Sequence, residues 1–186
     1  GIAISEAIEA VVKSEGKAKY ALGSVLGHVL MHQTINGNEA ILQMEHAGDY
    51  PDIIVGCTGG GSNLAGLMFP FLGQQLRGGQ KIDIIGCEPL SCPSFTKGKY
   101  AYDHGDMARM TPLIKMHTLG SDFLPPANHS GGLRYHGMSY HLSHLYDLGL
   151  MRAKAYGQKD CFEAGVIFGK QEGIIPAPEG NHAVKG

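Results

Sequence analysis

The sequence predicts an α/β protein, a three-layer sandwich in which a mostly parallel sheet carries helices on both faces. Two short apolar runs, at 53–55 and 82–87, lack the polar–apolar alternation of a half-exposed strand, and this is typical of strands buried on both faces. A glycine-rich loop and a helical pattern over 62–76 separate the two runs. Together these features predict one right-handed βαβ crossover over residues 52–87.

The remaining elements follow from the same periodicities. The patterns predict helices over 2–13, 34–47, 138–148 and 160–172, the last ended by Gly173, and a strand over 153–156. The stretch 20–31 fits either a strand or a buried helix. Residues 88–140 are rich in glycine, proline and histidine and show weak periodicity, so we expect long loops there that are functional or poorly ordered.

The overall composition limits the possible partners. The chain has 186 residues, which suits one domain or a domain with a fragment of another. An apolar content of 43% argues against disorder, and a net charge of −2 gives no electrostatic reason to expect nucleic acid or a membrane surface as a partner. No run approaches the roughly 18 apolar residues that a transmembrane helix needs.

The cysteines and the chain ends lead to two further expectations. Cys57, Cys87, Cys92 and Cys161 form no C-x-x-C pair, so we expect free thiols in a reducing compartment and a cytoplasmic protein. The chain begins without methionine and stops where a helix seems to start, so we expect a piece of a longer protein.

The most informative stretch is DIIVGCTGGGSNLAG, residues 52–66. The glycines at 59–61 let backbone N–H groups point into one small space, and the helix that follows adds its N-terminal N–H groups and positive dipole end. Neither the dinucleotide pattern G-x-G-x-x-G nor the P-loop pattern fits, so a single terminal phosphate is the better ligand. A glycine turn that only lets the helix pack near the strand is the alternative.

These residues carry a resemblance to a known family. The segment CTGGGSNLAG resembles the cofactor-phosphate loop of tryptophan synthase β chains, enzymes that use pyridoxal 5′-phosphate (PLP). Further segments resemble that family in the same order: HQTINGNEA (32–40), PSFTKGKYAYDHGD (93–106), TPLIKMHTLGSDFLPP (111–126), HSGGLRYHGM (129–138) and EGIIPAPEGNHA (172–183). The similarity is greatest to the auxiliary branch of the family.

The resemblance implies a fold and a reaction. The fold is the large domain of PLP fold-type II, with residues 32–186 as a cofactor phosphate-binding α/β domain truncated at its C-terminus. Residues 1–31 belong to the preceding domain or to a hinge. The reaction is β-replacement of L-serine by indole to give L-tryptophan, in a protein that forms a homodimer; whether an α subunit binds stays open.

The resemblance also assigns site residues. The cofactor phosphate would be held by Gly59, Gly60, Gly61, Ser62 and Asn63. Glu179 would lie beside the cofactor ring, although a carboxylate favoured by a helix N-terminus is the other interpretation. Arg134 occupies the place of an acidic residue that faces the serine hydroxyl in the main branch. It would bind a carboxylate- or phosphate-bearing substrate, or else be a surface side chain.

The chemistry also needs a lysine for the Schiff base, and in the family that lysine follows a histidine. No His-Lys pair occurs in this chain, so we predict no catalytic residue here and expect the chain alone to be inactive. Two alternatives remain open. One is a related PLP-dependent lyase acting on serine, phosphoserine or threonine, and the other is a non-catalytic module that binds a phosphorylated small molecule or a partner subunit.

Other chemistry-bearing residues form weaker patterns. His136, His141 and His144 lack an H-E-x-x-H pattern and flanking cysteines, so we predict no metal site. Asp103 and Asp106 fit either a carboxylate acid–base pair or the ordinary residues of a turn.

Overall fold

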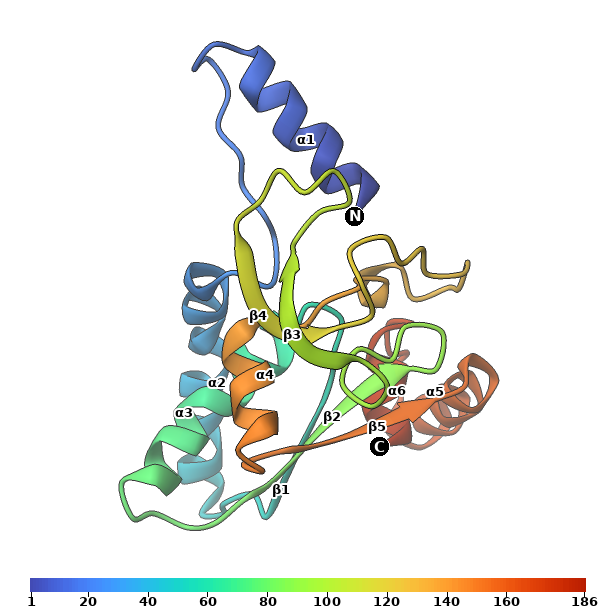
Figure 1. Ribbon diagram of the computed structural model, residues 1–186. Helices are drawn as coiled ribbons and strands as arrows, with labels where there is room; N and C mark the ends of the chain where they lie inside the picture. Colours follow the sequence, from blue (N-terminus) through green and yellow to red (C-terminus); the bar gives the residue numbers. More distant parts are fainter.

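The computed structural model describes residues 1–186, and a three-stranded parallel sheet lies at its centre (Figure 1). The strands are β1 (Ile53–Cys57), β2 (Asp83–Pro89) and β5 (Arg152–Tyr156), in the order β1-β2-β5. The register between the first two runs from Ile53 opposite Asp83 to Cys57 opposite Cys87. Helix α3 (Ser62–Leu76) connects them, so the predicted strand–loop–helix–strand unit is confirmed.

Successive side chains of the strands face different helix layers, which makes the fold a three-layer sandwich. Ile54 and Ile84 belong to the main hydrophobic core with Leu64 of α3. Val55 and Cys87 face the opposite side, where they lie against Gly186 at the end of α6 (Gly180–Lys185). Helices therefore cover both faces of a mostly parallel sheet, and the predicted fold class is confirmed.

Helix α2 (Gly27–Ala47) packs tightly on α3 because glycines lie at their contact. A Cβ atom on Gly37 would lie 2.4 Å from the carbonyl oxygen of Leu67, and one on Gly66 would lie 2.5 Å from that of Gln33. The helix begins earlier than the predicted residue 34. It runs across the expected domain division after residue 31, and it ends at Gly48 in the left-handed conformation (φ 70°).

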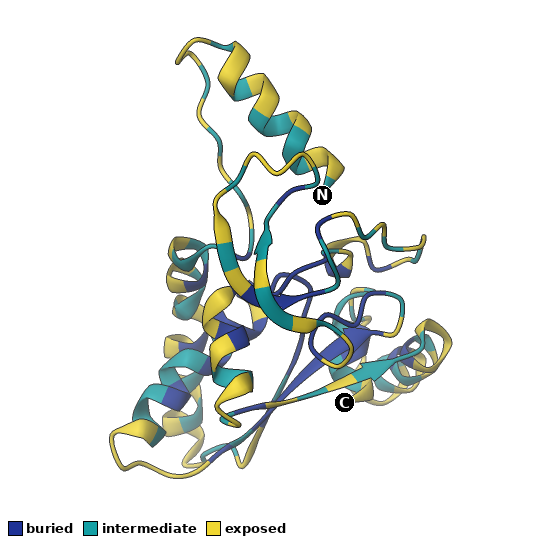
Figure 2. Cartoon of the chain, viewed as in Figure 1, coloured by how far each residue is buried: buried dark blue, intermediate teal, exposed yellow.

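The main core lies between this helix pair, the sheet and α4 (Tyr140–Asp147), where a helix over 138–148 was predicted. Its most deeply buried side chains are Leu30, Leu64, Met68, Phe71, Ile84, Met138 and Leu142. Figure 2 shows this contrast as dark blue on the central strands and the inner helix faces, and yellow on the outer surfaces.

The region 88–140 is more regular than predicted. It contains an antiparallel hairpin of β3 (Lys99–His104) and β4 (Leu113–Thr118), and a short 3₁₀ helix, η1 (Gly131–Leu133). The strands were missed because β3 has no fully buried residue, so it lacks the apolar run or strict alternation that marks a strand. Their pairing with each other, rather than local preference, makes them strands.

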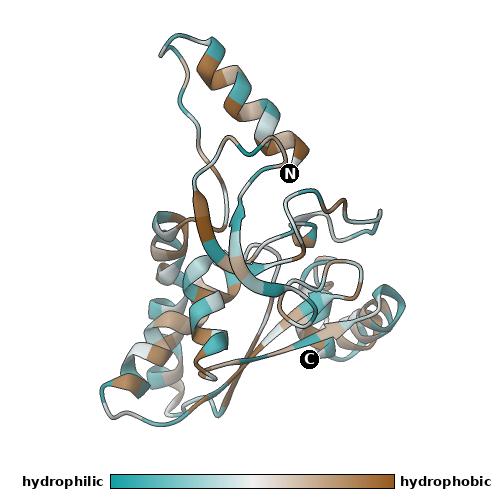
Figure 3. Cartoon of the chain, viewed as in Figure 1, coloured by the Kyte–Doolittle hydropathy of each residue, from teal (hydrophilic) through white to brown (hydrophobic).

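Helix α1 (Ile2–Lys13) has the predicted bounds but stands away from the body of the molecule (Figure 1). None of its residues is buried, although hydrophobic and hydrophilic residues alternate around it in Figure 3. Its side chains Ile4 and Ile8 cover an apolar cavity of about 310 Å³ against the hairpin, and the Ser5 hydroxyl donates to Asp106 Oδ2 at 2.9 Å.

The C-terminal part agrees closely with the sequence pattern. Helix α5 (Gln158–Glu172) ends at Gly173, whose φ of 70° is the left-handed cap that was predicted. All cysteines are free, as predicted, and all are buried. None of the helices combines the length and the apolar composition that crossing a bilayer requires.

Candidate functional site

The glycine loop lies between β1 and α3, at the carboxyl end of the parallel strands. None of the backbone N–H groups of residues 59–64 donates a hydrogen bond, and α3 begins without a side-chain cap. The first paired N–H after the loop is that of Ala65, which donates to the Gly61 carbonyl at 3.0 Å. Because residues 59–62 are buried and buried N–H groups are normally paired, this run of free donors is suited to an anionic ligand.

Each glycine of the loop is required by a neighbouring segment. A Cβ atom on Gly59 would lie 2.4 Å from the Gly132 carbonyl oxygen. One on Gly60 would lie 2.6 Å from Val25 Cγ2, and one on Gly61 would lie 2.5 Å from Leu142 Cδ1. Gly61 also has a φ of 99°, which side-chain-bearing residues rarely adopt. The loop is therefore a bare backbone held between three parts of the chain.

The two residues after the glycines contribute differently. Ser62 is buried, and its hydroxyl makes no hydrogen bond, so it remains available to a ligand beside the free N–H groups. Asn63 is exposed, and its side-chain amide donates to Cys57 Sγ at 3.4 Å. The asparagine side chain thus points back toward β1, which leaves its backbone N–H as the group that faces a ligand.

Glu179 lies close to the loop through one shared peptide. It is the N-cap residue of α6, and its Oε1 accepts from the Gly132 N–H at 2.9 Å. The same Gly132 places its carbonyl against Gly59. The structure therefore brings Glu179 and the glycine loop together, and it also agrees with the interpretation of Glu179 as a helix N-terminal carboxylate. Nothing in the sequence indicated that Gly132 would bridge Glu179 and Gly59, apart from the glycine pair at 131–132.

Arg134 makes no hydrogen bond with the loop. It is exposed at the end of η1, and its Nη2 donates to the Pro125 carbonyl at 2.9 Å. It makes no ion pair, so its positive charge is not neutralised by a carboxylate of the chain. No hydrogen bond or ion pair joins a lysine to the loop or to Glu179.

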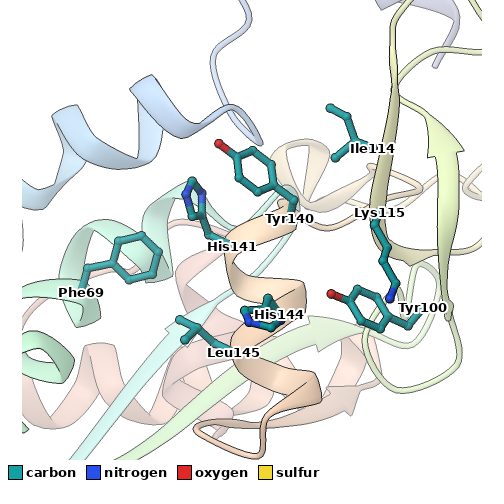
Figure 4. A pocket seen from close by; sticks show the side chains of 8 residues that line it. All are labelled: Phe69, Tyr100, Ile114, Lys115, Tyr140, His141, His144 and Leu145. Atoms are coloured by element: carbon teal, nitrogen blue, oxygen red, sulfur yellow. The ribbon is translucent and has the colours of Figure 1, made fainter. Parts of the chain in front are cut away.

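None of the cavities described here is lined by the glycine loop. A polar cavity of about 220 Å³ lies nearby, beyond the carboxyl ends of β2 and β5, and is lined by residues that include Ser91, Asn128 and His182. A hollow of about 430 Å³ lies between α4 and the hairpin (Figure 4). In it, the Lys115 ammonium lies 4.4 Å from the centre of the Tyr100 ring. Nothing in the sequence pattern had indicated either cavity.

The histidines and the aspartate pair have structural surroundings. No group of three or more histidine, cysteine, aspartate or glutamate side chains is placed to hold a metal ion. Asp103 accepts from the Thr118 hydroxyl at 2.6 Å, whereas Asp106 accepts from Thr111 and Ser5. Burial acts to raise the pKa of Asp106, but these hydrogen bonds outweigh it and lower the pKa to about 2. The two carboxylates share no partner, which favours turn residues over an acid–base pair.

Comparison with known proteins identifies the class. A family model described as pyridoxal-phosphate dependent enzyme matches residues 7–186, so this chain belongs to that family. The fold agrees: the solved structure of a threonine deaminase from T.th. superposes with a TM-score of 0.70 over 96% of this chain and 57% of its own, at 15% identity. The free N–H groups of the glycine loop fit the phosphate of the cofactor that gives the family its name.

Among curated proteins the similarity is more specific. The chain is 56% identical to tryptophan synthase beta chain 2 of Aquifex aeolicus, and all of it is covered. It is 55% identical to the protein of the same name from Thermotoga maritima. The chain spans only 43% and 44% of these two relatives, which is less than half of their length.

Proposed function

We propose that this chain is the phosphate-holding part of a PLP-dependent enzyme similar to tryptophan synthase β chains. The observation that carries the proposal is the run of unpaired N–H groups at residues 59–64, in the loop before α3 and its first turn, where all residues except Asn63 are buried. In this proposal the phosphate is bound by Gly59, Gly60, Gly61, Ser62 and Asn63. The glycines and Asn63 donate backbone N–H groups, and Ser62 adds its hydroxyl.

In the same proposal Glu179 lies beside the cofactor ring. The Glu179 carboxylate accepts from the Gly132 N–H, and the carbonyl of Gly132 packs on Gly59. Glu179 therefore holds the segment around Gly132 against the glycine loop. When bound, PLP supplies the electron-withdrawing ring that makes the α-carbon of an amino acid reactive. In this proposal the residues of this chain bind and orient the cofactor, and none of them is assigned to proton transfer.

The reaction we propose for the longer protein is β-replacement of L-serine by indole to give L-tryptophan. The printed names of the relatives and the 56% identity support it. Such an enzyme acts in the cytoplasm as a homodimer. An α subunit as a further partner stays outside the proposal, because none of the surfaces described indicates one.

We also propose a division of the chain into two units. Helix α1 has no buried residue, whereas α2 belongs to the main core from Leu30 onward. The division that we propose after residue 31 falls within α2, and the nearest break between helices is the non-helical segment 14–26. This segment connects α1 to the cofactor phosphate-binding domain.

Arg134 favours a second candidate, a lyase acting on an anionic amino acid such as phosphoserine. Its guanidinium is exposed, is bonded only to a backbone carbonyl, and lies two residues from Gly132 at the edge of the site. In both candidates we assign Arg134 to the binding of a substrate carboxylate or phosphate. Replacing Arg134 by Gln should weaken the use of phosphoserine by the full-length protein more than the use of serine.

Equilibrium dialysis of the 186-residue chain against PLP and against pyridoxal tests the proposal. We expect PLP to bind and inorganic phosphate to displace it, whereas pyridoxal, which lacks the phosphate, should bind far more weakly. Ser62→Asp should abolish PLP binding, because its carboxylate would lie in the anion site; Ser14→Asp at the end of α1 is the control. Equal binding of PLP and pyridoxal would refute the proposal.

A borohydride experiment tests the expected absence of the Schiff-base lysine. After reduction of the chain with bound PLP, mass spectrometry should find no lysine carrying the cofactor. Stable labelling of a single lysine would show that the chain contains the covalent attachment site after all.

A further inference from the structure

Val25 has a strained backbone in a buried position. Its φ is 71°, a value that β-branched residues very rarely adopt, and its side chain is only 3% exposed. The N–H of Leu26 donates to the Ser24 carbonyl at 2.8 Å across Val25. This bond closes a γ-turn with a positive φ at its centre, one of the least favourable turns for an L-residue. Strain of this kind persists only where the surroundings enforce it.

The strained residue lies directly against the glycine loop. The nearest atoms to a Cβ on Gly60 would be Val25 Cγ2 at 2.6 Å and Ser24 Oγ at 2.8 Å. The other flanks of the loop are supported elsewhere, Gly59 by Gly132 and Gly61 by Leu142. The Ser24–Val25 segment thus supports the middle glycine.

The other side of Val25 faces the apolar cavity under α1. That cavity of about 310 Å³ is lined by Val25 together with Ile4 and Ile8 of α1 and Met116 of β4. The valine side chain is therefore the wall between this empty space and the loop. A glycine would relieve the unfavourable φ, but it would leave the Gly60 peptide free to move toward the cavity.

We propose that Val25 is a positioning residue of the anion site: its strained γ-turn presses the side chain against Gly60 and keeps the N–H groups of residues 59–64 aimed at one point. The identity of the anion as the PLP phosphate rests on the proposed function. The positioning itself is a property of the ligand-free chain.

Hydrogen exchange of the ligand-free chain tests the positioning directly. In Val25→Gly we expect faster exchange of the amides of Ala65 and Ser139, which donate to the carbonyls of Gly61 and Gly60 at 3.0 Å and so report whether the loop is held in place. The unfolding midpoint should stay close to wild type because relief of strain offsets the lost apolar contact. Val25→Ala keeps the backbone conformation but removes the methyl that touches Gly60, and it should show the same effect more weakly. The matched control is Glu15→Gly, which relieves a φ of 50° at an exposed residue remote from the loop.

PLP dialysis gives the second measurement. Val25→Gly should bind PLP about tenfold more weakly, the equivalent of one charge-assisted hydrogen bond, whereas Glu15→Gly should bind it as wild type does. Unchanged exchange of the Ala65 and Ser139 amides in both Val25 variants would overturn the inference, as would equal weakening of PLP binding in Glu15→Gly. If wild type fails to bind PLP while Val25→Gly still exchanges faster, the proposed function fails and the positioning role stands.

Discussion

The β1–α3 junction and the α1–hairpin contact both contain buried polar groups, but the two regions use them in opposite ways. At the junction, the N–H groups of residues 59–64 have no partner within the chain. At the hairpin, the Asp106 carboxylate is fully buried and accepts hydrogen bonds from Ser5 and Thr111. A satisfied buried group holds structure together, whereas a run of unsatisfied ones marks a place built for a ligand.

The helices of these two regions, α3 at the junction and α1 at the hairpin, also differ in how much of their surface is buried. Both α1 and α3 have the bounds that their apolar periodicity predicts. Seven residues of α3 are buried, including Leu64 and Met68, while α1 has none. Periodicity therefore indicates that a helix forms, but the energy that holds it depends on the partner it meets.

The largest expected effect on the unfolding free energy comes from truncating one apolar side chain in each region. Leu30→Ala in α2 should lower the unfolding free energy by about 3 kcal/mol, because a fully buried side chain leaves a cavity in the main core. Ile8→Ala in α1 should cost about 1 kcal/mol, since its side chain already borders a cavity. Chemical denaturation measures both values, and equal losses would contradict the difference between the two regions.

A second test concerns the close packing of α2 on α3. Gly37→Ala should destabilise the chain by about 2 kcal/mol, because the added methyl meets backbone that has no room to shift. Gly73→Ala is the matched control: its Cβ would meet only the flexible side chain of Arg77, and alanine favours the helix by about 1 kcal/mol. A stabilising effect of Gly37→Ala in urea denaturation would show that the helices are not in contact there.

A third test uses pH. His117 is buried against Phe95, Tyr100 and Tyr146, and neither ring nitrogen has a hydrogen-bond partner of good geometry. Burial lowers its pKa below 6.5, although Asp147 and the backbone of Gly98 act to raise it. The unfolded chain therefore binds a proton that the folded chain resists. The contribution of this histidine is fully present above pH 6.5 and falls as the pH decreases below it.

His117→Phe should remove part of this acid sensitivity while keeping stability at about pH 8, because a phenyl ring suits the aromatic cluster and leaves no unpaired nitrogen. Denaturation midpoints between about pH 8 and about pH 5 measure the effect. His144→Phe at an exposed position of α4 is the control for the change of residue type. An identical pH profile for wild type and His117→Phe would show that His117 does not contribute.

The smallest expected effect is local to α1. Ser5→Ala removes the hydroxyl that donates to Asp106 and accepts from the Ala108 N–H, and it should cost about 1 kcal/mol. Hydrogen exchange should rise over residues 2–13 but not in α3. Glu6→Gln, an exposed change on the same helix, should leave exchange unaltered. Faster exchange in α3 as well would mean that α1 is coupled to the core more strongly than its contacts indicate.

Several features of the site were accessible from the sequence. The loop at 59–63 could be predicted because consecutive glycines between a buried strand and a helix are typical of a backbone that approaches a ligand closely. The hairpin at 99–118 could not, because its strands depend on pairing with each other and one of them has no buried face. The contact between Glu179 and Gly132, and the role of Val25, involve segments far apart in the chain.

The sequence by itself determined the parallel α/β class, most helix bounds and the family resemblance, since these depend on local periodicity and on short ordered motifs. Only the tertiary structure decided that the N–H groups of the loop remain unpaired, that α1 stays largely exposed, and that Val25 adopts a strained turn against Gly60. The physical reason is that hydrogen-bond satisfaction and backbone strain are properties of contacts between distant segments, and a local pattern carries no record of those contacts.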